Sequence, residues 1–326
     1  MKQPTASAVR VSYDDLYTFA REALQRVDVP EDSAALVARL LATNDLRGGL
    51  SHGTQQIPRY VHEIQTGTVN PQPNVRIVNE TANSLLIDGD GGLGYGPFHD
   101  GTQRAIEKAK AQGMAMVVTR HHGHIGAAGI YPRLAAAADL CAFATSGVQL
   151  TLKPGENVYQ AAGASPMSFA APAGDERPLV LDCGVMHGLH PSRPRRNLEK
   201  HVPSIILRLI GFGTICQAWG GLLTGLPVDV GDTTPRWPRA HQGALLFVFD
   251  PGLFIDRDQF KREMDDYARR VRQLRPVPGT EGAYLPGAIE IEREQTYRRD
   301  GVPLSDRHQR QLHDVAQALG FTLPWQ

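Results

Sequence analysis

The sequence predicts an α/β protein in which helices from both ends of the chain accompany a body of short β-strands. Three observations support this prediction: helical spacing of apolar residues over 12–66, strand-like apolar runs from Val75 onward, and renewed helical spacing after Phe260. Of the 326 residues, 41% are apolar, which is typical of a globular protein with a substantial core. Because this length exceeds what one core usually serves, we expect two or three domains or subdomains.

The first part of the chain, residues 12–66, is expected to form three helices joined by short loops. Ser12 and Asp15 make a capping pattern at the start of the first helix. Pro30 suits the first turn of the second helix. Apolar residues spaced between Ile57 and Ile64 indicate the buried face of the third. The linker TGTVNPQPN, residues 66–74, then ends the helical pattern.

The middle of the chain changes to short apolar runs separated by turn residues. We expect strands at VRIVN (75–79), NSLLID (83–88), MAMVVT (114–119), CAFAT (141–145), MSFAA (167–171), PLVLD (178–182) and ALLFVF (244–249). Helices are expected at residues 97–113, 260–274 and 304–319. An uncharged stretch at 209–228 is long enough to span a membrane, but its five glycines and its proline favour a buried helix.

The charge balance excludes some classes of partner. The chain has 34 Lys and Arg against 34 Asp and Glu, so no net positive charge attracts it to nucleic acid or to an anionic membrane. The expected partner is therefore a small molecule or another protein. Cys141, Cys183 and Cys216 lie in apolar segments without CxxC spacing, which favours reduced, buried thiols in a cytoplasmic protein. The N-terminus lacks the apolar run of a secretory signal.

One glycine motif has two interpretations. Residues 89–94 spell GxGxxG between an apolar run and a predicted helix, which is the context of a Rossmann phosphate cradle. The acidic residue expected about 20 positions later is absent, because the sequence there is MAMVVTR. The favoured interpretation is a glycine-rich turn between a strand and a helix, with the dinucleotide cradle as the alternative.

Several segments in a fixed order resemble the second malate/L-lactate dehydrogenase family, over about residues 10–320. They are Asp45–Gly48 with Ser51–Gly53, Asp88–Gly94, His124–Tyr131, Gly163–Pro166, Leu181–Asp182, Leu222–Gly225 and Leu285–Gly287. The resemblance implies an L-sulfolactate dehydrogenase-like α/β (α+β) fold: a helical domain, 1–74 completed by about 275–326, and a cofactor domain, 75–274. It also implies that this second domain is built on a mostly antiparallel, non-Rossmann sheet, and that the protein is a homodimer. The family includes sulfolactate and ureidoglycolate dehydrogenases and cyclic-imine reductases.

The resemblance also assigns site residues. Ser51 and His52 match the pair that supplies the proton, a task that suits histidine because its unperturbed pKa is about 6.5. From the residues alone, the favoured interpretation is that Ser51 caps a helix and His52 is a loop histidine; the resemblance reverses this preference. His124 is also assigned as a catalytic residue. It lies with the remaining matches beside a nicotinamide cofactor, NAD or NADP: His124, Ile125, Gly126, Ala127, Ala128, Asp182 and Arg208. His121, His122 and His124 lack acidic or cysteine neighbours, so we expect no metal.

The departures from the family pattern concern charge. Gln56 stands where the family has an arginine that holds the substrate carboxylate, so Arg59 or Arg47 replaces it, or the substrate lacks that carboxylate. Gln217 replaces a glutamate, and Ala164 and Ala288 replace polar residues. A long family segment is reduced to residues 183–204. Its basic tract, residues 190–196, is either a solvated loop or a replacement anion site.

These observations predict an NAD(P)-dependent oxidoreductase that moves a hydride between nicotinamide and a 2-oxo or 2-hydroxy acid, or a related cyclic imine. The departures motivate an alternative, in which the fold is kept for cofactor-independent acid–base chemistry by a hydrolase, lyase or isomerase. A ligand-binding or regulatory protein is the non-enzymatic alternative. The substrate, and the choice between NAD and NADP, stay open at this point.

Overall fold

The computed structural model describes residues 9–163, 165–184, 193–229 and 236–325, with the backbone alone at 193–195. The chain divides into two compact units. Unit 1 comprises Met1–Pro73 and Ala288–Gln326, and unit 2 comprises Asn74–Gly287. The boundary that the sequence placed near residue 275 therefore falls inside unit 2.

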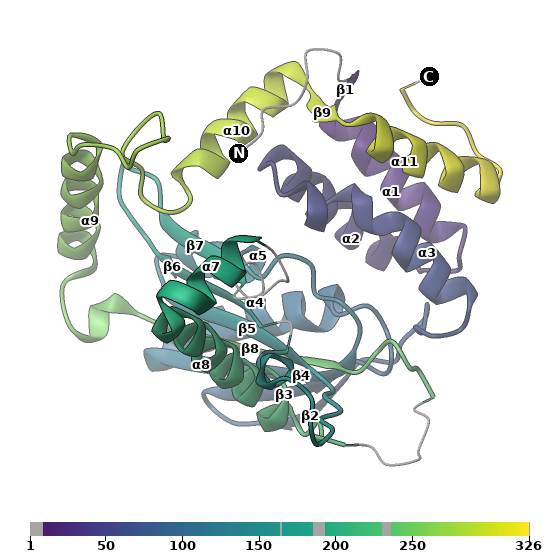
Figure 1. The fold of residues 1–326 in the computed structure, drawn as a ribbon, viewed down its shortest axis with the longest axis horizontal. Coiled ribbons are helices and arrows are strands. Elements are labelled where there is room, and N and C mark those ends of the chain that lie inside the picture. Colours follow the sequence, from purple (N-terminus) through teal and green to yellow (C-terminus); the bar gives the residue numbers. More distant parts are fainter. Residues whose placement is uncertain (1–8, 164, 185–192, 230–235, 326) are drawn as a thin grey trace. The chain divides into compact units, whose positions relative to one another are not determined.

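Unit 1 brings the two ends of the chain into one helical body (Figure 1). Its elements are β1 (Val9–Val11), α1 (Tyr13–Gln25), α2 (Glu31–Leu46), η1 (Leu50–His52), η2 (Thr54–Gln56), α3 (Ile57–Gln65), α10 (Ala288–Asp300), β9 (Val302–Leu304) and α11 (Asp306–Leu319). β1 pairs antiparallel with β9, so a two-stranded sheet ties the two termini together. The sequence did not predict α10.

Local signals explain where these helices begin. The Ser12 hydroxyl accepts a hydrogen bond from the Asp15 backbone N–H at the start of α1, as the capping pattern predicted. Pro30 is the residue before the first turn of α2. The apolar faces then pack together, and Leu16, Leu41 and Tyr60 have no exposed surface. The three predicted N-terminal helices are confirmed.

Unit 2 is built on a seven-stranded sheet with the order β2-β3-β4-β8-β5-β6-β7. The strands are β2 (Arg76–Glu80), β3 (Ser84–Asp88), β4 (Met114–His122), β5 (Cys141–Val148), β6 (Pro166–Ala171), β7 (Leu179–Gly184) and β8 (Gln242–Phe249). Only β3 and β4 pair in parallel; every other neighbouring pair is antiparallel. The expected non-Rossmann, mostly antiparallel sheet is confirmed.

In unit 2, α4 and α8 pack on opposite faces of the sheet. The helices of this unit are α4 (Tyr95–Gln112), α5 (Ile130–Ala136), α7 (Arg193–His201), α8 (Pro203–Gly220) and α9 (Arg257–Arg272), with single turns η3 (Val158–Ala162), η4 (Leu222–Thr224) and η5 (Pro251–Leu253). Successive side chains of a strand point to opposite faces. Val117 of β4 accordingly packs near Gly101 of α4, whereas the neighbouring Met116 lines a groove with Trp219 of α8.

Two sequence-based expectations need correction. The stretch 209–228 was expected to be a buried helix, but α8 buries only one face. The other face of α8 is exposed at Leu207 (67%) and Phe212 (56%), and Leu223, just after the helix, is 58% exposed. By length and composition, Pro203–Thr224 is also a candidate membrane span, and 39% of its apolar window is buried. Cys183, expected to be buried, is exposed because β7 is the edge strand of the sheet.

Candidate active site

Ser51 and His52 lie on the single turn η1, directly after α2 in unit 1. The Ser51 hydroxyl is 3.1 Å from Nδ1 of His52, so the two side chains form a hydrogen-bonded pair. Ser51 is exposed and His52 is partly exposed. The turn is tied down from two sides, because Asn44 Nδ2 donates to the His52 carbonyl at 3.0 Å and Gln56 Nε2 donates to the Ser51 carbonyl at 2.6 Å. The predicted proton-donating pair therefore has a defined geometry.

A buried polar cluster that sequence reasoning missed lies beneath this turn. Asp45 Oδ2 accepts from the backbone N–H of Thr54 at 2.9 Å and from the Thr54 hydroxyl at 2.6 Å. The same hydroxyl is 3.1 Å from Nε2 of His308, on α11. Asp45 and His308 are completely buried. Burial raises the pKa of Asp45 to about 7 and lowers the pKa of His308 to about 4.

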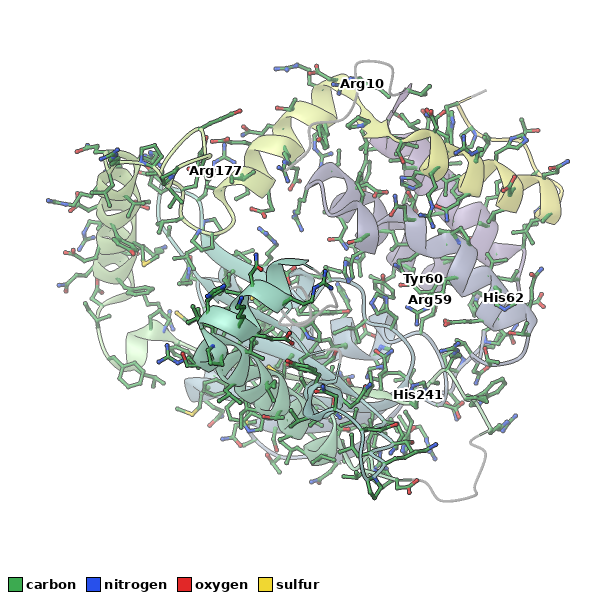
Figure 2. All side chains as sticks on the ribbon, in the orientation of Figure 1. Arg10, Arg59, Tyr60, His62, Arg177 and His241 are labelled. Atoms are coloured by element: carbon green, nitrogen blue, oxygen red, sulfur yellow. The ribbon has the colours of Figure 1, made fainter. Side chains whose placement is uncertain are left out.

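Both candidate replacements for the carboxylate-binding arginine already pair with a glutamate. Arg47 Nε donates to Glu294 at 2.9 Å, and Arg59 Nε donates to Glu63 at 2.8 Å. Arg59 lies on α3 beside the buried Tyr60 (Figure 2) and is the more exposed of the two arginines, at 43% against 23%. In each pair the guanidinium Nε makes the contact to the glutamate.

The predicted cofactor segment, residues 124–128, precedes α5 in unit 2. Ile125 and Ala128 are buried, whereas His124 and Ala127 are partly exposed. Gly126 has a φ of +78°, and a Cβ there would lie 2.7 Å from the Tyr95 hydroxyl. Only glycine fits this position without strain. Gly126 therefore lets the backbone of this segment pass close to the buried Tyr95 ring.

Asp182 has a different role from the one that the helix start suggested. Its Oδ2 accepts a hydrogen bond from the Gly129 N–H at 3.0 Å, at the first residue before α5. A carboxylate of the protein therefore already balances the partial positive charge at this helix end. The Gly129 amide is therefore occupied by the protein's own carboxylate.

The glycine turn at 89–94 is likewise closed to phosphate. The backbone N–H groups of Gly89, Gly91 and Gly94 donate to the carbonyls of residues 120, 121 and 124 at 2.8–3.0 Å. A phosphate cradle needs such N–H groups to point at the ligand. The structure therefore supports the glycine-rich turn and contradicts the dinucleotide cradle.

The histidines at 121 and 122 are also occupied by protein contacts. His121 Nδ1 is 2.9 Å from Asp88 Oδ2. His122 is buried between Thr119 and the Gly123 carbonyl, and burial lowers its pKa to about 4. Within the described ranges, no group of three His, Cys, Asp or Glu side chains is placed to hold a metal ion.

The structure describes only some of the remaining predicted positions. Arg208 is an exposed residue of α8. Ala288 is the first residue of α10. Ala164, residues 185–192 and the side chains of 193–195 lie outside the described residues, so most of the basic tract at 190–196 does too.

Comparison with known proteins settles the family. The model of the malate/L-lactate dehydrogenase family matches residues 11–186 and 210–313, which is most of the chain. The chain belongs to the malate/L-lactate dehydrogenase family. It is an oxidoreductase of this family, whose members act on 2-hydroxy acids. The unmatched residues 187–209 include much of the shortened segment.

Individual relatives agree over nearly their whole length. The L-sulfolactate dehydrogenase of Methanocaldococcus jannaschii is 28% identical over 331 residues, covering 93% of this chain and 95% of the relative. The malate dehydrogenase of Pyrococcus horikoshii is 28% identical over 346 residues, covering 96% of each. The solved structure of malate dehydrogenase from that organism superimposes with a TM-score of 0.82, covering 99% of both chains at 26% identity. A ureidoglycolate dehydrogenase (NAD(+)) of Escherichia coli is 23% identical, covering 91% of this chain and 93% of the relative.

In this dehydrogenase, the departure at Gln217 is structural. Gln217 Nε2 donates to the Val148 carbonyl at 2.5 Å, and its Oε1 accepts from the Val148 N–H at 3.1 Å. The side chain is 3% exposed, so it fastens α8 to the end of β5. A glutamate could not make both bonds while ionised, because a carboxylate has no donor.

The structure thus gathers the predicted residues into two local groups. Ser51, His52 and Gln56 share one anchored turn in unit 1, and residues 124–128 with Asp182 surround the start of α5 in unit 2. The missed residues were Asp45, Thr54 and His308. Asp45 follows Ala38 and Leu41 on the buried side of α2, and a carboxylate in such an apolar stripe was the available signal.

Proposed function

We propose that this protein is a nicotinamide-dependent dehydrogenase that interconverts a 2-oxo acid, or a related cyclic imine, and its reduced form. The observation that supports this most directly is the hydrogen-bonded Ser51–His52 pair on an anchored turn, in a chain of a 2-hydroxy acid dehydrogenase family. A bound nicotinamide, NAD or NADP, would supply or accept the hydride. The protein then has to bind, orient and protonate the substrate.

The protein's own contribution to the chemistry is proton transfer at the substrate oxygen or nitrogen. In the reducing direction, the proton passes from Nδ1 of His52 through Oγ of Ser51 to the atom that gains negative charge. The 3.1 Å contact sets the first step, and the exposed Ser51 hydroxyl makes the second. A histidine is suited to this exchange because its ordinary pKa lies near neutral pH.

Residues 124–128 are the proposed support for the nicotinamide. His124 and Ala127 are partly exposed, and the small residues Gly126, Ala127 and Ala128 allow a ligand to approach the backbone closely. Arg208 is the proposed contact to a cofactor phosphate, because it is an exposed cation and a guanidinium matches phosphate geometry.

Arg59 is the proposed contact to the substrate carboxylate. Gln56, at the family's arginine position, directs its amide to the Ser51 carbonyl and fixes the turn instead. Arg59 is one helical turn further along, and 43% of its side chain is exposed. A charge-assisted contact of this kind contributes about 1.5–3 kcal/mol.

The test is a kinetic screen with NADH and NADPH against a panel of 2-oxo acids and cyclic imine carboxylates, followed by absorbance at the reduced nicotinamide band. We expect turnover with at least one substrate and a loss of at least about 100-fold in His52→Ala. His62→Ala is the matched control, since His62 is an exposed histidine of α3 (Figure 2). If neither NADH nor NADPH binds at millimolar concentration, the proposal is refuted.

The apolar outer face of α8 supports a further part of this proposal, a homodimer. This face comprises Leu207, Phe212, Ile215, Trp219, Leu222 and Leu223, which are 44–67% exposed. Beside it, a groove of about 610 Å³ on the open face of the sheet is lined by Met116, Phe169, Phe247 and other apolar residues. Contiguous apolar surface of this kind marks an interface.

A second copy of the chain fits this face better than a lipid bilayer does. The charge balance of 34 against 34 gives no attraction to anionic lipid. Arg208 is the one charged residue in α8, and charge depletion is characteristic of an interface core. Sedimentation equilibrium should show a dimer that Leu223→Asp converts to monomer. A monomeric wild type, or flotation with liposomes, would contradict this. Free thiols at Cys141, Cys183 and Cys216 accord with a cytoplasmic dimer.

A further inference from the structure

The Ser51–His52 turn is held mainly by α2, the helix that precedes it. Besides the bond from Asn44 to the His52 carbonyl, both donors of Thr54 converge on a single oxygen of Asp45. Gly53 permits this arrangement, because a Cβ at that position would lie 1.8 Å from Asp45 Oδ1. The carboxylate therefore lies directly against the backbone that follows His52.

The hydrogen-bond directions in this cluster depend on one another. When Asp45 is ionised, the Thr54 hydroxyl gives its only proton to Oδ2, so His308 must donate from Nε2 to the Thr54 oxygen. His308 is uncharged at neutral pH, because burial lowers its pKa to about 4. The chain of bonds thus runs from α11 through Thr54 to the end of α2.

Keeping a carboxylate in this place lowers the stability of the fold. Asp45 is completely buried, and its Oδ1 and His308 Nδ1 have no hydrogen-bond partner among the described residues. Burial raises the pKa of Asp45 to about 7. A raised folded-state pKa means that its stability contribution is fully present below the unfolded pKa and is lost as pH rises through 7. Ionisation of Asp45 therefore lowers the free energy of unfolding.

We propose that Asp45 is a positioning residue for catalysis: its carboxylate, fixed through Thr54 and His308, sets the orientation of the Ser51–His52 pair. This inference rests on the proposed function of that pair. Asp45 does not touch the reacting atoms; it acts through the backbone of Gly53 and Thr54. The geometry makes the unusual prediction that removing its charge stabilises the protein and slows the enzyme.

Asp45→Asn is the informative variant, because the amide keeps the shape and one acceptor while abolishing ionisation. We expect kcat to fall roughly 10- to 100-fold, with KM within about threefold, since small misplacement of a catalytic group has effects of this size. Thr54→Val, which removes the shared hydroxyl, should lower kcat similarly. Asp32→Asn is the matched control, an exposed aspartate of the same helix, and should change neither kcat nor stability.

Thermal stability distinguishes a positioning role from a purely structural one. If Asp45 only supported the fold, Asp45→Asn would lower the thermal midpoint, whereas we expect it to raise the midpoint. The thermal midpoint of Asp45→Asn should exceed that of Asp32→Asn at pH 8 and approach it at pH 5. Both variants keep the other titratable and charged groups on the elements around α2, so these groups do not account for the difference in thermal midpoint. They are His52 of η1, His308 of α11, Arg293 of α10, and the ion pairs Arg47–Glu294, Arg59–Glu63 and Arg21–Glu31.

NMR separates this inference from the proposed function. The histidine Cε1–H resonance that disappears in His52→Ala reports the environment of His52 whether or not turnover is found. Asp45→Asn should shift that resonance, and Asp32→Asn should not. A wild type without dehydrogenase activity refutes the proposed function alone. An unshifted His52 resonance with unchanged kcat overturns the positioning role of Asp45, and so does an Asp45→Asn variant that loses stability and activity together.

Discussion

Gln217→Glu restores the residue that the family pattern expects, and the structure predicts that this restoration is harmful. The substitution replaces the Nε2 donor with a second oxygen, so a carboxylate oxygen would face the Val148 carbonyl across a separation that is now 2.5 Å. The site is 3% exposed, so water cannot take the place of the lost donor.

The magnitude follows from the two bonds. Loss of the donated bond removes about 0.5–1.5 kcal/mol, and the buried carbonyl left without a donor costs about 1–3 kcal/mol more. We therefore expect the free energy of unfolding to fall by about 2–4 kcal/mol at pH 8. Protonation of the introduced carboxyl group would restore an O–H donor, so the loss should shrink toward pH 5 as the raised pKa of this group is approached.

Urea unfolding followed by circular dichroism at pH 8 and pH 5 measures both effects. Gln103→Glu is the control, since it makes the same chemical change at an exposed position of α4. Equal stability of the two variants at pH 8 would refute the role assigned to the Gln217 side chain. A loss that is the same at both pH values would refute the explanation by charge.

Two further predictions concern the body of unit 2. Gly91→Ala should lower the free energy of unfolding by about 1–3 kcal/mol and alter tryptophan fluorescence, because φ is +80° and a Cβ would lie 2.1 Å from Trp237; an unchanged unfolding curve would contradict this. The hydrogen bond from Arg257 lowers the pKa of Asp250 in the folded protein. The ionised Asp250 therefore stabilises the fold above the pKa of the unfolded state, and this stabilisation is lost as pH falls through the pKa of the folded state. Arg257→Gln should therefore move acid unfolding, followed by circular dichroism, to higher pH, whereas Arg270→Gln, in a more exposed pair, should not.

The elements that were predictable from sequence are those fixed by local signals. The cap at Ser12 and the apolar spacing of residues 57–64 depend on neighbours within one or two turns, so α1 and α3 could be placed. The apolar runs likewise located the strands of the main sheet. Their order was not predictable from periodicity, because β8 pairs with both β4 and β5 and no local signal specifies that insertion. The resemblance supplied the mostly antiparallel class of the sheet.

The site was predictable only where a motif names the residue. Ser51 and His52 were found from their motif, whereas His308 lies 254 positions from the Thr54 hydroxyl that it contacts. Polar residues inside apolar helix stripes were the signal available for the rest. His308 stands in the same stripe as Leu312 and Val315 of α11, as Asp45 does in α2. Only the tertiary structure shows that Asp45 and His308 are connected through Thr54.

The contacts also distinguish the positions where an amide stands in place of a charged family residue from a position where a buried charge is present. At positions 56 and 217 an amide replaces a charged family residue, and each amide nitrogen donates to a backbone carbonyl. These exchanges support local structure. Asp45 shows the opposite choice, because a carboxylate accepts both bonds from Thr54 there at the cost of burying a charge. A carboxylate retained against its effect on stability, next to the proton-transferring pair, is best explained by the reaction that the pair performs.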